Sequence, residues 1–390
     1  MTNQESPKIL VYTGLFPWEN ISKSRILSND LIGGNTGNLL FSWSTLNIFS
    51  DVPHENFTKV YITLENQLIN YEFDYFLLPL ANTFRENNDE ELIFLISLLK
   101  KISCKVLLNG IGGQFGKVGF HKFSNEQLIR EFIELLIEKT TSIGVRDERT
   151  KEYITEFLGY SEAEVVVIGC PSVRILNEKL HAKEYLPFNA DFKLAINYTP
   201  GSYDRKWGHF IDSVFKNYDK SYAVFQDLDE GELISHGKNL VGLKRHDLIP
   251  TFTEHPIIKE QRYRLFVNPI DWIDEMHEFQ FSIGTRIHGN IAAILAGVPA
   301  LVIAIDSRTA GLAQTHHIPY IWFDELTDKT RIEELYYRSC TEMTKFYTHL
   351  DEINERYFGF IKKNLGLDVR AWNNLSLSKN KKGRKIEKIP

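Results

Sequence analysis

An arginine and a histidine two positions apart, Arg286 and His288, have the residue types and spacing that most clearly suggest chemistry. They follow an apolar run, Phe279–Ile283, which predicts a strand, and they open a helical pattern that ends at Gly297 and Pro299. Both side chains are therefore expected in the first turn of a helix, where free backbone N–H groups favour an anion. A guanidinium matches phosphate or carboxylate oxygens, and an imidazole can supply a proton near neutral pH.

The helix dipole opposes a cation at a helix N-terminus, so an anionic ligand would explain why an arginine stands at position 286. In the alternative interpretation, Arg286 pairs with a carboxylate of the other domain and His288 only caps the turn. The pattern favours the ligand-binding interpretation.

The elements that position these residues are predicted by short β-branched runs alternating with helix-period segments, the pattern of βαβ units around a parallel sheet. The expected strands are Ile9–Tyr12, Val60–Thr63, Phe76–Leu80, Lys105–Leu108, Ser142–Val145, Val165–Ile168, Leu194–Tyr198, Tyr222–Phe225, Phe279–Ile283 and Leu301–Ile305. The helices expected in the first half are Leu39–Phe49, Glu90–Lys101, Asn125–Lys139 and Thr150–Leu158. In the third of these, the expected core-facing residues are Leu128, Phe132, Leu135 and Leu136.

A length of 390 residues favours two domains. A polar stretch around Asn177–Asp191 places their boundary, giving domains at 1–185 and 186–328. A helical segment at 329–365 is expected to pack back across the junction, before a basic tail at 366–390. Two doubly wound α/β domains facing a cleft would bind ligands at the carboxyl ends of their strands.

Composition excludes several classes of protein. A net charge of −6 gives no overall field that attracts nucleic acid. No apolar run is long enough for a membrane span, the first residues lack a signal-peptide pattern, and the three cysteines have no metal spacing. We therefore expect a cytoplasmic protein without a metal site. The basic tail is expected to be solvated, or alternatively to touch an anionic membrane surface.

Several short motifs occur in a characteristic order. They are Gly34-Asn-Thr-Gly-Asn38, Asn109-Gly-Ile-Gly-Gly113, Gly144-Val-Arg-Asp147, Ile168-Gly-Cys-Pro-Ser172 and Gly284-Thr-Arg-Ile-His-Gly289. The ordered set resembles the polysaccharide pyruvyl transferase family over about Gly33 to Arg308. Two positions depart from that family's pattern, because Asn38 stands where an aspartate is common and Arg308 where a lysine is frequent.

The resemblance implies two Rossmann-like domains in a glycosyltransferase-B-like arrangement, with the acceptor on the N-terminal side and the donor on the C-terminal side. It also implies transfer of a pyruvyl group from phosphoenolpyruvate onto two hydroxyls of a sugar, lipid-linked or nucleotide-linked, with no cofactor. His288 would be the general acid and Arg286 the anion clamp. The other substrate-binding residues implied are Thr285, Gly289, Arg205, Arg308, Asn35, Gly37, Asn38 and Arg146.

Some of these assignments have alternatives. Arg205 is a candidate for a second donor-binding arginine, or a solvated loop residue. Gly33–Asn38 wraps the acceptor or only caps a helix. Arg146 reaches the cleft or only forms a local ion pair; the second interpretation is favoured, because the adjacent Asp147 is a good N-cap for the helix that follows.

Two rival functions remain at this point. The first is a nucleotide-sugar glycosyltransferase of the same architecture, in which Arg286 holds a diphosphate. The second is an inactive partner that binds a polysaccharide precursor. An NAD enzyme is disfavoured, because Phe115 occupies the last glycine position of the dinucleotide pattern.

Overall fold

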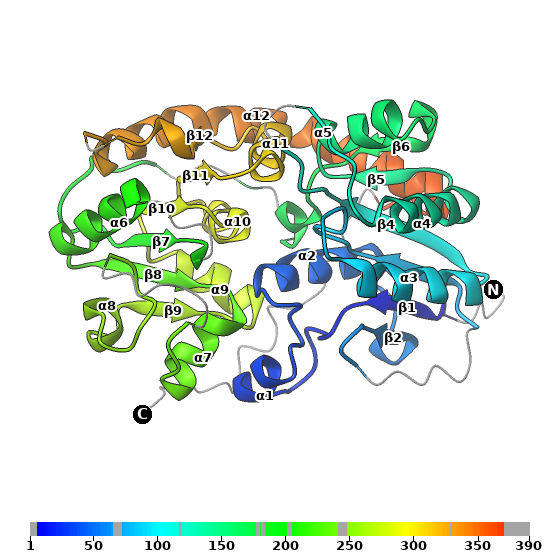
Figure 1. Cartoon of the computed structure of the whole chain (residues 1–390), viewed down its shortest axis with the longest axis horizontal. Coiled ribbons are helices and arrows are strands. Elements are labelled where there is room, and N and C mark those ends of the chain that lie inside the picture. Colours follow the sequence, from blue (N-terminus) through cyan, green and yellow to red (C-terminus); the bar gives the residue numbers. More distant parts are fainter. Residues whose placement is uncertain are drawn as a thin grey trace.

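The structure is a computed structural model that describes residues 6–64, 72–116, 119–176, 180, 184–200, 205–240, 248–327 and 329–369. Its strands form two six-stranded sheets in which every pairing is parallel (Figure 1). The strands of the first sheet are β1 (Ile9–Tyr12), β2 (Phe57–Val60), β3 (Tyr75–Leu78), β4 (Lys105–Ile111), β5 (Ile143–Val145) and β6 (Val165–Val167). Those of the second are β7 (Leu194–Asn197), β8 (Ser221–Phe225), β9 (Tyr263–Leu265), β10 (Phe281–Gly284), β11 (Ala300–Ala304) and β12 (Tyr320–Trp322).

The connections between strands contain the helices. In the first half these are α1 (Lys23–Ser28), α2 (Gly37–Leu46), α3 (Asp89–Lys101), α4 (Glu126–Lys139) and α5 (Glu148–Glu152). In the second half they are α6 (Arg205–Asn217), α7 (Leu228–His236), α8 (Pro256–Lys259), α9 (Pro269–Met276), α10 (Ile287–Leu295), α11 (Ser307–Thr315) and α12 (Ile332–Leu365).

The strand orders define where each sheet can bind a ligand. The first sheet has the order β2-β1-β3-β4-β5-β6, and the second has the order β12-β11-β10-β7-β8-β9. The chain therefore reverses its direction of winding between β1 and β3, and again between β7 and β10. Such a switch point leaves a crevice at the carboxyl ends of the two strands. The second sheet has the dinucleotide-fold order, and the predicted pair of Rossmann-like domains is confirmed.

Residue alternation along the strands divides the core of the first sheet. In β1, Ile9 and Val11 pack in the cluster that includes Trp43 of α2, whereas Leu10 lies in the cluster that includes Phe132 of α4. This follows from the two-residue period of a strand, which sends successive side chains to opposite faces. Both faces of β1 are covered, so all four of its residues are buried.

The long helix α12 packs against both sheets (Figure 1). Near its start, Ser339 Oγ donates to the carbonyl of Ala300 in β11 at 2.9 Å. Near its end, Asn364 Oδ1 accepts from the backbone of Ser142, just before β5, at 3.0 Å. This one helix therefore contacts strands of both sheets. The domain limits at 185, 328 and 365 stay predictions, and the tail from residue 370 lies outside the described residues.

Some expected elements differ from the structure. The second strand is Phe57–Val60 rather than Val60–Thr63, and the edge strands β9 and β12 were not expected. The buried apolar residues of α4 are Ile129, Phe132, Ile133 and Leu136. Phe132 and Leu136 were predicted to face the core, whereas the predicted Leu128 and Leu135 are only partly buried against it. Among the described residues, no helix is both long and apolar enough to cross a membrane.

Candidate active site

A cavity of about 930 Å³ lies between the carboxyl ends of the two sheets. Its walls include Thr13 after β1 and Pro79 after β3, and also Thr199 after β7 and Thr285 after β10. Both switch points therefore open into the same space. Thr199 Oγ1 lies 3.0 Å from Thr285 Oγ1, which joins the two loops of the second switch point.

The turn between β10 and α10 is held by two buried asparagines. Asn290 donates to the carbonyls of Gly284 and Arg286 at 3.1 and 3.2 Å, and Asn197 Oδ1 accepts from the backbone N–H of Arg286 at 2.7 Å. A Cβ on Gly284 would lie 1.7 Å from the carbonyl oxygen of Asn197, so this close approach requires glycine. The network fixes Arg286 at the N-cap of α10, as the sequence predicts.

Arg286 lines the cavity and pairs with a carboxylate of its own domain. Its Nη2 donates to Asp227 Oδ2, and its Nε donates to the carbonyl of Tyr198 at 3.3 Å. Asp227 Oδ1 also accepts from Asn35 Nδ2, on the N-terminal side, at 2.9 Å. Burial raises the pKa of Asp227, while the charge of Arg286 acts in the opposite direction. The alternative interpretation, in which Arg286 pairs with a carboxylate of the other domain, is therefore not met: the carboxylate is in the same half of the chain, and the other domain contributes an amide that binds the same aspartate.

His288 lies deeper, with 7% of its surface exposed. Its Nε2 is 3.6 Å from Cys170 Sγ, and a Cβ on Gly37 would lie 2.7 Å from its Nδ1. Burial lowers the pKa of His288 well below its ordinary value, and the charges of Arg146, Arg308 and Arg286 lower this pKa further. The protein's own groups therefore keep the imidazole neutral at pH 7.

Arg146 is a buried cation in the cavity wall. Only 2% of its surface is exposed, its Nε donates to the carbonyl of Gly110 at 2.7 Å, and its guanidinium lies 4.5 Å from the centroid of Phe41. Its Nη2 has no hydrogen-bond partner among the described residues, although it is buried. Asp147 caps α5 by accepting from the backbone of Thr150, as the sequence predicts, but the favoured local ion pair of Arg146 is not formed.

Arg308 follows β11 and also lines the cavity. Its Nη2 lies 3.4 Å from Asp306 Oδ2, and Asp306 caps α11 through its other oxygen. Arg146, Arg286 and Arg308 therefore bring three guanidinium groups from both domains to the space around His288. An arrangement of this kind suits a ligand with more than one negative charge.

The other predicted residues have different positions. Asn35, Asn38 and Thr285 line the cavity; Asn38 donates to the carbonyls of Ile32 and Gly33 at 3.0 and 3.1 Å. An aspartate could not donate these bonds, which gives the departure at position 38 a structural reason.

Two predicted glycines allow close packing instead of lining the cavity. Gly37 lies against His288, and a Cβ on Gly289 would lie 2.7 Å from Gln226 Nε2. The side chain of Arg205 lies outside the described residues.

Comparison with known proteins identifies the family. The family model described as polysaccharide pyruvyl transferase matches residues 35–307. This range contains Arg146, Arg286 and His288. The chain belongs to the polysaccharide pyruvyl transferase family. The family name describes a transferase that acts in polysaccharide synthesis, with a pyruvyl donor and a sugar acceptor. No curated protein matches the chain.

Solved structures resemble this pyruvyl transferase family member at low identity. A UDP-N-acetylglucosamine 2-epimerase is 12% identical with a TM-score of 0.44, over 92% of this chain and 96% of that one. A functionally uncharacterised protein of Klebsiella pneumoniae subsp. pneumoniae is 13% identical with a TM-score of 0.42, over 80% and 88%. An Anabaena protein in complex with UDP and glucose is 10% identical with a TM-score of 0.41, over 92% and 95%.

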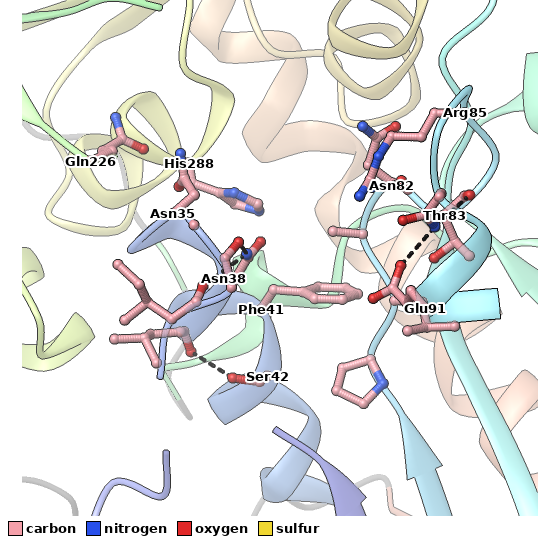
Figure 2. Close-up of a pocket in the computed structure, with 18 of the residues that line it drawn as sticks. Asn35, Asn38, Phe41, Ser42, Asn82, Thr83, Arg85, Glu91, Gln226 and His288 are labelled. Atoms are coloured by element: carbon pink, nitrogen blue, oxygen red, sulfur yellow. Dashed lines mark hydrogen bonds between the residues drawn. The ribbon is translucent and has the colours of Figure 1, made fainter. Parts of the chain in front are cut away.

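Sequence reasoning missed part of the transferase's cavity. Figure 2 shows His288 and Asn38 on one side of it and Asn82, Arg85 and Glu91 on the other, separated by Phe41. The second group comes from the loop after β3 and the start of α3, where no motif marks it. Only the position of these residues after a strand at a switch point could have indicated them.

Proposed function

We propose that this protein transfers a pyruvyl group from phosphoenolpyruvate onto two hydroxyls of a sugar, as a cyclic ketal. His288 is the general acid, and Arg146, Arg286 and Arg308 bind the carboxylate and phosphate of the donor. The observation that carries the proposal is the group of three guanidiniums around His288 in a cavity shared by both domains. No cofactor is needed for this reaction.

The proposed reaction needs a proton at a defined point. The methylene carbon of the donor takes a proton from His288, which leaves a cation-like centre at the carbon that bears the carboxylate and phosphate. One sugar hydroxyl adds to that carbon, the phosphate leaves, and the second hydroxyl closes the ring. The two hydroxyls lose two protons, one replacing that of His288 and the other leaving with phosphate, so atoms and charge balance.

The charge of the donor offers a reason for the position of His288. Burial and the three arginines lower the pKa of this imidazole, so without a bound donor it carries no proton to give at pH 7. A bound donor brings negative charges that oppose those of the guanidiniums, and an opposite charge nearby raises the pKa of a histidine. His288 thus becomes an acid when the substrate that needs its proton is bound.

The acceptor is proposed to be lipid-linked or nucleotide-linked, and the reaction cytoplasmic. The basic tail, which lies outside the described residues, carries the charge for loose contact with an anionic membrane surface.

The test combines binding and turnover. Phosphoenolpyruvate is expected to raise the melting temperature, whereas UDP is not. With a panel of lipid-linked and nucleotide-linked sugars, mass spectrometry should detect a pyruvyl ketal, and phosphate should be released in equal amount. His288→Gln should bind the donor and release no phosphate. Stabilisation by UDP alone would instead favour a nucleotide-sugar glycosyltransferase.

A further inference from the structure

We infer that the end of the cavity next to α3 binds an uncharged sugar of the acceptor and rejects uronates, and that Glu91 sets this selectivity. This inference rests on the proposed function and adds the charge class of the acceptor. It concerns the part of the cavity that lies across Phe41 from His288 (Figure 2).

The two ends of the cavity differ in charge. Arg146, Arg286 and Arg308 surround His288, whereas the opposite end contains the carboxylates of Asp30 and Glu91. The guanidinium of Arg85 lies at this end and donates to the backbone carbonyl of Asn82. Asp89 and Glu90, in the first turn of α3, also line this end. Four carboxylates against one guanidinium leave a net negative charge, which disfavours an anionic ligand there.

Glu91 is held in one orientation by two donors. Tyr12 Oη donates to its Oε1 at 3.0 Å, and Asn88 Nδ2 donates to its Oε2 at 2.8 Å. Burial and the charge of Glu91 raise the pKa of Tyr12, which keeps the phenol protonated and able to donate. A carboxylate has about four acceptor positions, so the two that remain can accept hydroxyl groups of a ligand.

The surrounding wall suits a sugar. The rings of Tyr12 and Tyr61 lie 5.0 Å apart and give this end an aromatic surface, as small-molecule sites commonly have. Asn82 Oδ1 is buried and has no hydrogen-bond partner among the described residues. A ligand that donates hydroxyl groups would satisfy this oxygen together with Glu91, whereas a carboxylate can donate to neither.

Binding of matched sugars tests the inference without requiring turnover. The probes are the methyl glycosides of glucose and galactose and those of the corresponding uronates, titrated into the full chain and followed by saturation-transfer NMR and calorimetry at neutral pH. We expect the neutral glycosides to bind at least about tenfold more tightly than the uronates. Glu91→Gln should reduce this ratio by about fivefold or more, since it removes the charge and keeps one acceptor oxygen.

The control variant is Glu131→Gln, which removes an exposed carboxylate paired with Lys100 and should leave the ratio unchanged. If Glu91→Gln does not fold, Asp30→Asn serves instead, and should also lower the ratio. Three results in the wild type would overturn the inference: equal binding of neutral glycosides and uronates, tighter binding of uronates, or no binding of either class.

Donor binding keeps this test separate from that of the proposed function. Stabilisation by phosphoenolpyruvate should be the same in Glu91→Gln and in the wild type. If phosphoenolpyruvate does not raise the melting temperature of the wild type, the proposed function is contradicted, even where the sugar preference is observed.

Discussion

Replacing Arg146 with methionine should separate stability from donor binding. The buried guanidinium has one hydrogen bond, to Gly110, and an Nη2 without a partner among the described residues. Burial lowers its pKa, which reflects the unfavourable environment of the charge. Methionine has a similar length and no charge, and replacing a buried ion by an apolar side chain is often neutral or stabilising.

The magnitudes follow from the contacts. Leaving the Gly110 carbonyl without its donor costs about 1 kcal/mol, which removal of the buried charge offsets, so the free energy of unfolding should change little. A charge-assisted hydrogen bond to an anion contributes about 1.5 to 3 kcal/mol. Arg146→Met should therefore weaken phosphoenolpyruvate binding by about 10- to 100-fold, and it should raise the pKa of His288 before donor is added.

Arg174 provides a matched control. It is also buried, but its guanidinium donates to Asn354 at 2.8 Å, to the carbonyl of Cys170 at 3.3 Å and to that of Ile353 at 3.1 Å. It is not among the residues that line the cavity. Burial also lowers the pKa of Arg174, to about 10, so removal of its charge offsets part of the cost of three acceptors losing their donor. Arg174→Met should still cost about 2 kcal/mol of stability, and should leave donor affinity of the folded protein unchanged.

Calorimetric titration with phosphoenolpyruvate gives the affinities, and urea unfolding gives the stabilities. The reasoning is refuted if Arg146→Met loses several kcal/mol of stability while donor affinity stays at the wild-type value. That result would make Arg146 a structural residue like Arg174.

Three further outcomes depend on pH. Donor binding near pH 7 should take up close to one proton, because the pKa of His288 starts well below its ordinary value and the donor raises it. Calorimetry in buffers of different ionisation enthalpy measures this proton uptake. His288→Gln should abolish the uptake. Burial raises the pKa of Glu230 from 4.5 to about 8, so the folded protein keeps a proton that the unfolded chain loses, and stability falls as pH rises through this range. Glu230→Gln should remove a slope of up to about 1.4 kcal/mol per pH unit in urea unfolding; an unchanged slope would contradict this. Burial lowers the pKa of His316 well below 6.5, so its contribution has the opposite sign and is lost as pH falls through 6.5. His316→Gln should reduce the loss of stability between pH 6.5 and 5.5 by about 1 kcal/mol, measured by urea unfolding at the two pH values.

The local sequence was sufficient to predict the position of most strands and of half of the candidate site. The strand Ile9–Tyr12 was predicted with its observed bounds, because its four residues form one continuous apolar run and all of them are buried. The edge strand β9 was missed because it has three residues, two of them half-buried, and includes Arg264. Short edge strands bury little apolar surface, so their sequences carry little of the pattern on which prediction depends.

The site was predictable where its residues share one turn. Arg286 and His288 stand together after β10, and the pattern of that turn placed them correctly at the start of α10. Asp227, which pairs with Arg286, comes from the loop after β8, 59 residues earlier. Its proximity arises from the order of strands in the sheet, and no local spacing expresses that order. The same holds for Tyr12 and Glu91, which meet across 79 residues.

The ion pair of Arg286 is compatible with its proposed role as an anion clamp. The dipole of α10 opposes a cation at its first turn, and Asp227 supplies the compensating charge within the protein. Asp227 also accepts from Asn35, and the backbone N–H of Thr36 donates to the carbonyl of Gln226 at 2.8 Å. The carboxylate that orients the guanidinium thus also joins the loop before α2 to the opposite domain. Since Arg146 comes from the first domain and Arg286 from the second, a donor can contact both only while this junction is closed. The aspartate therefore orients one arginine and helps to hold the other within reach of the same ligand.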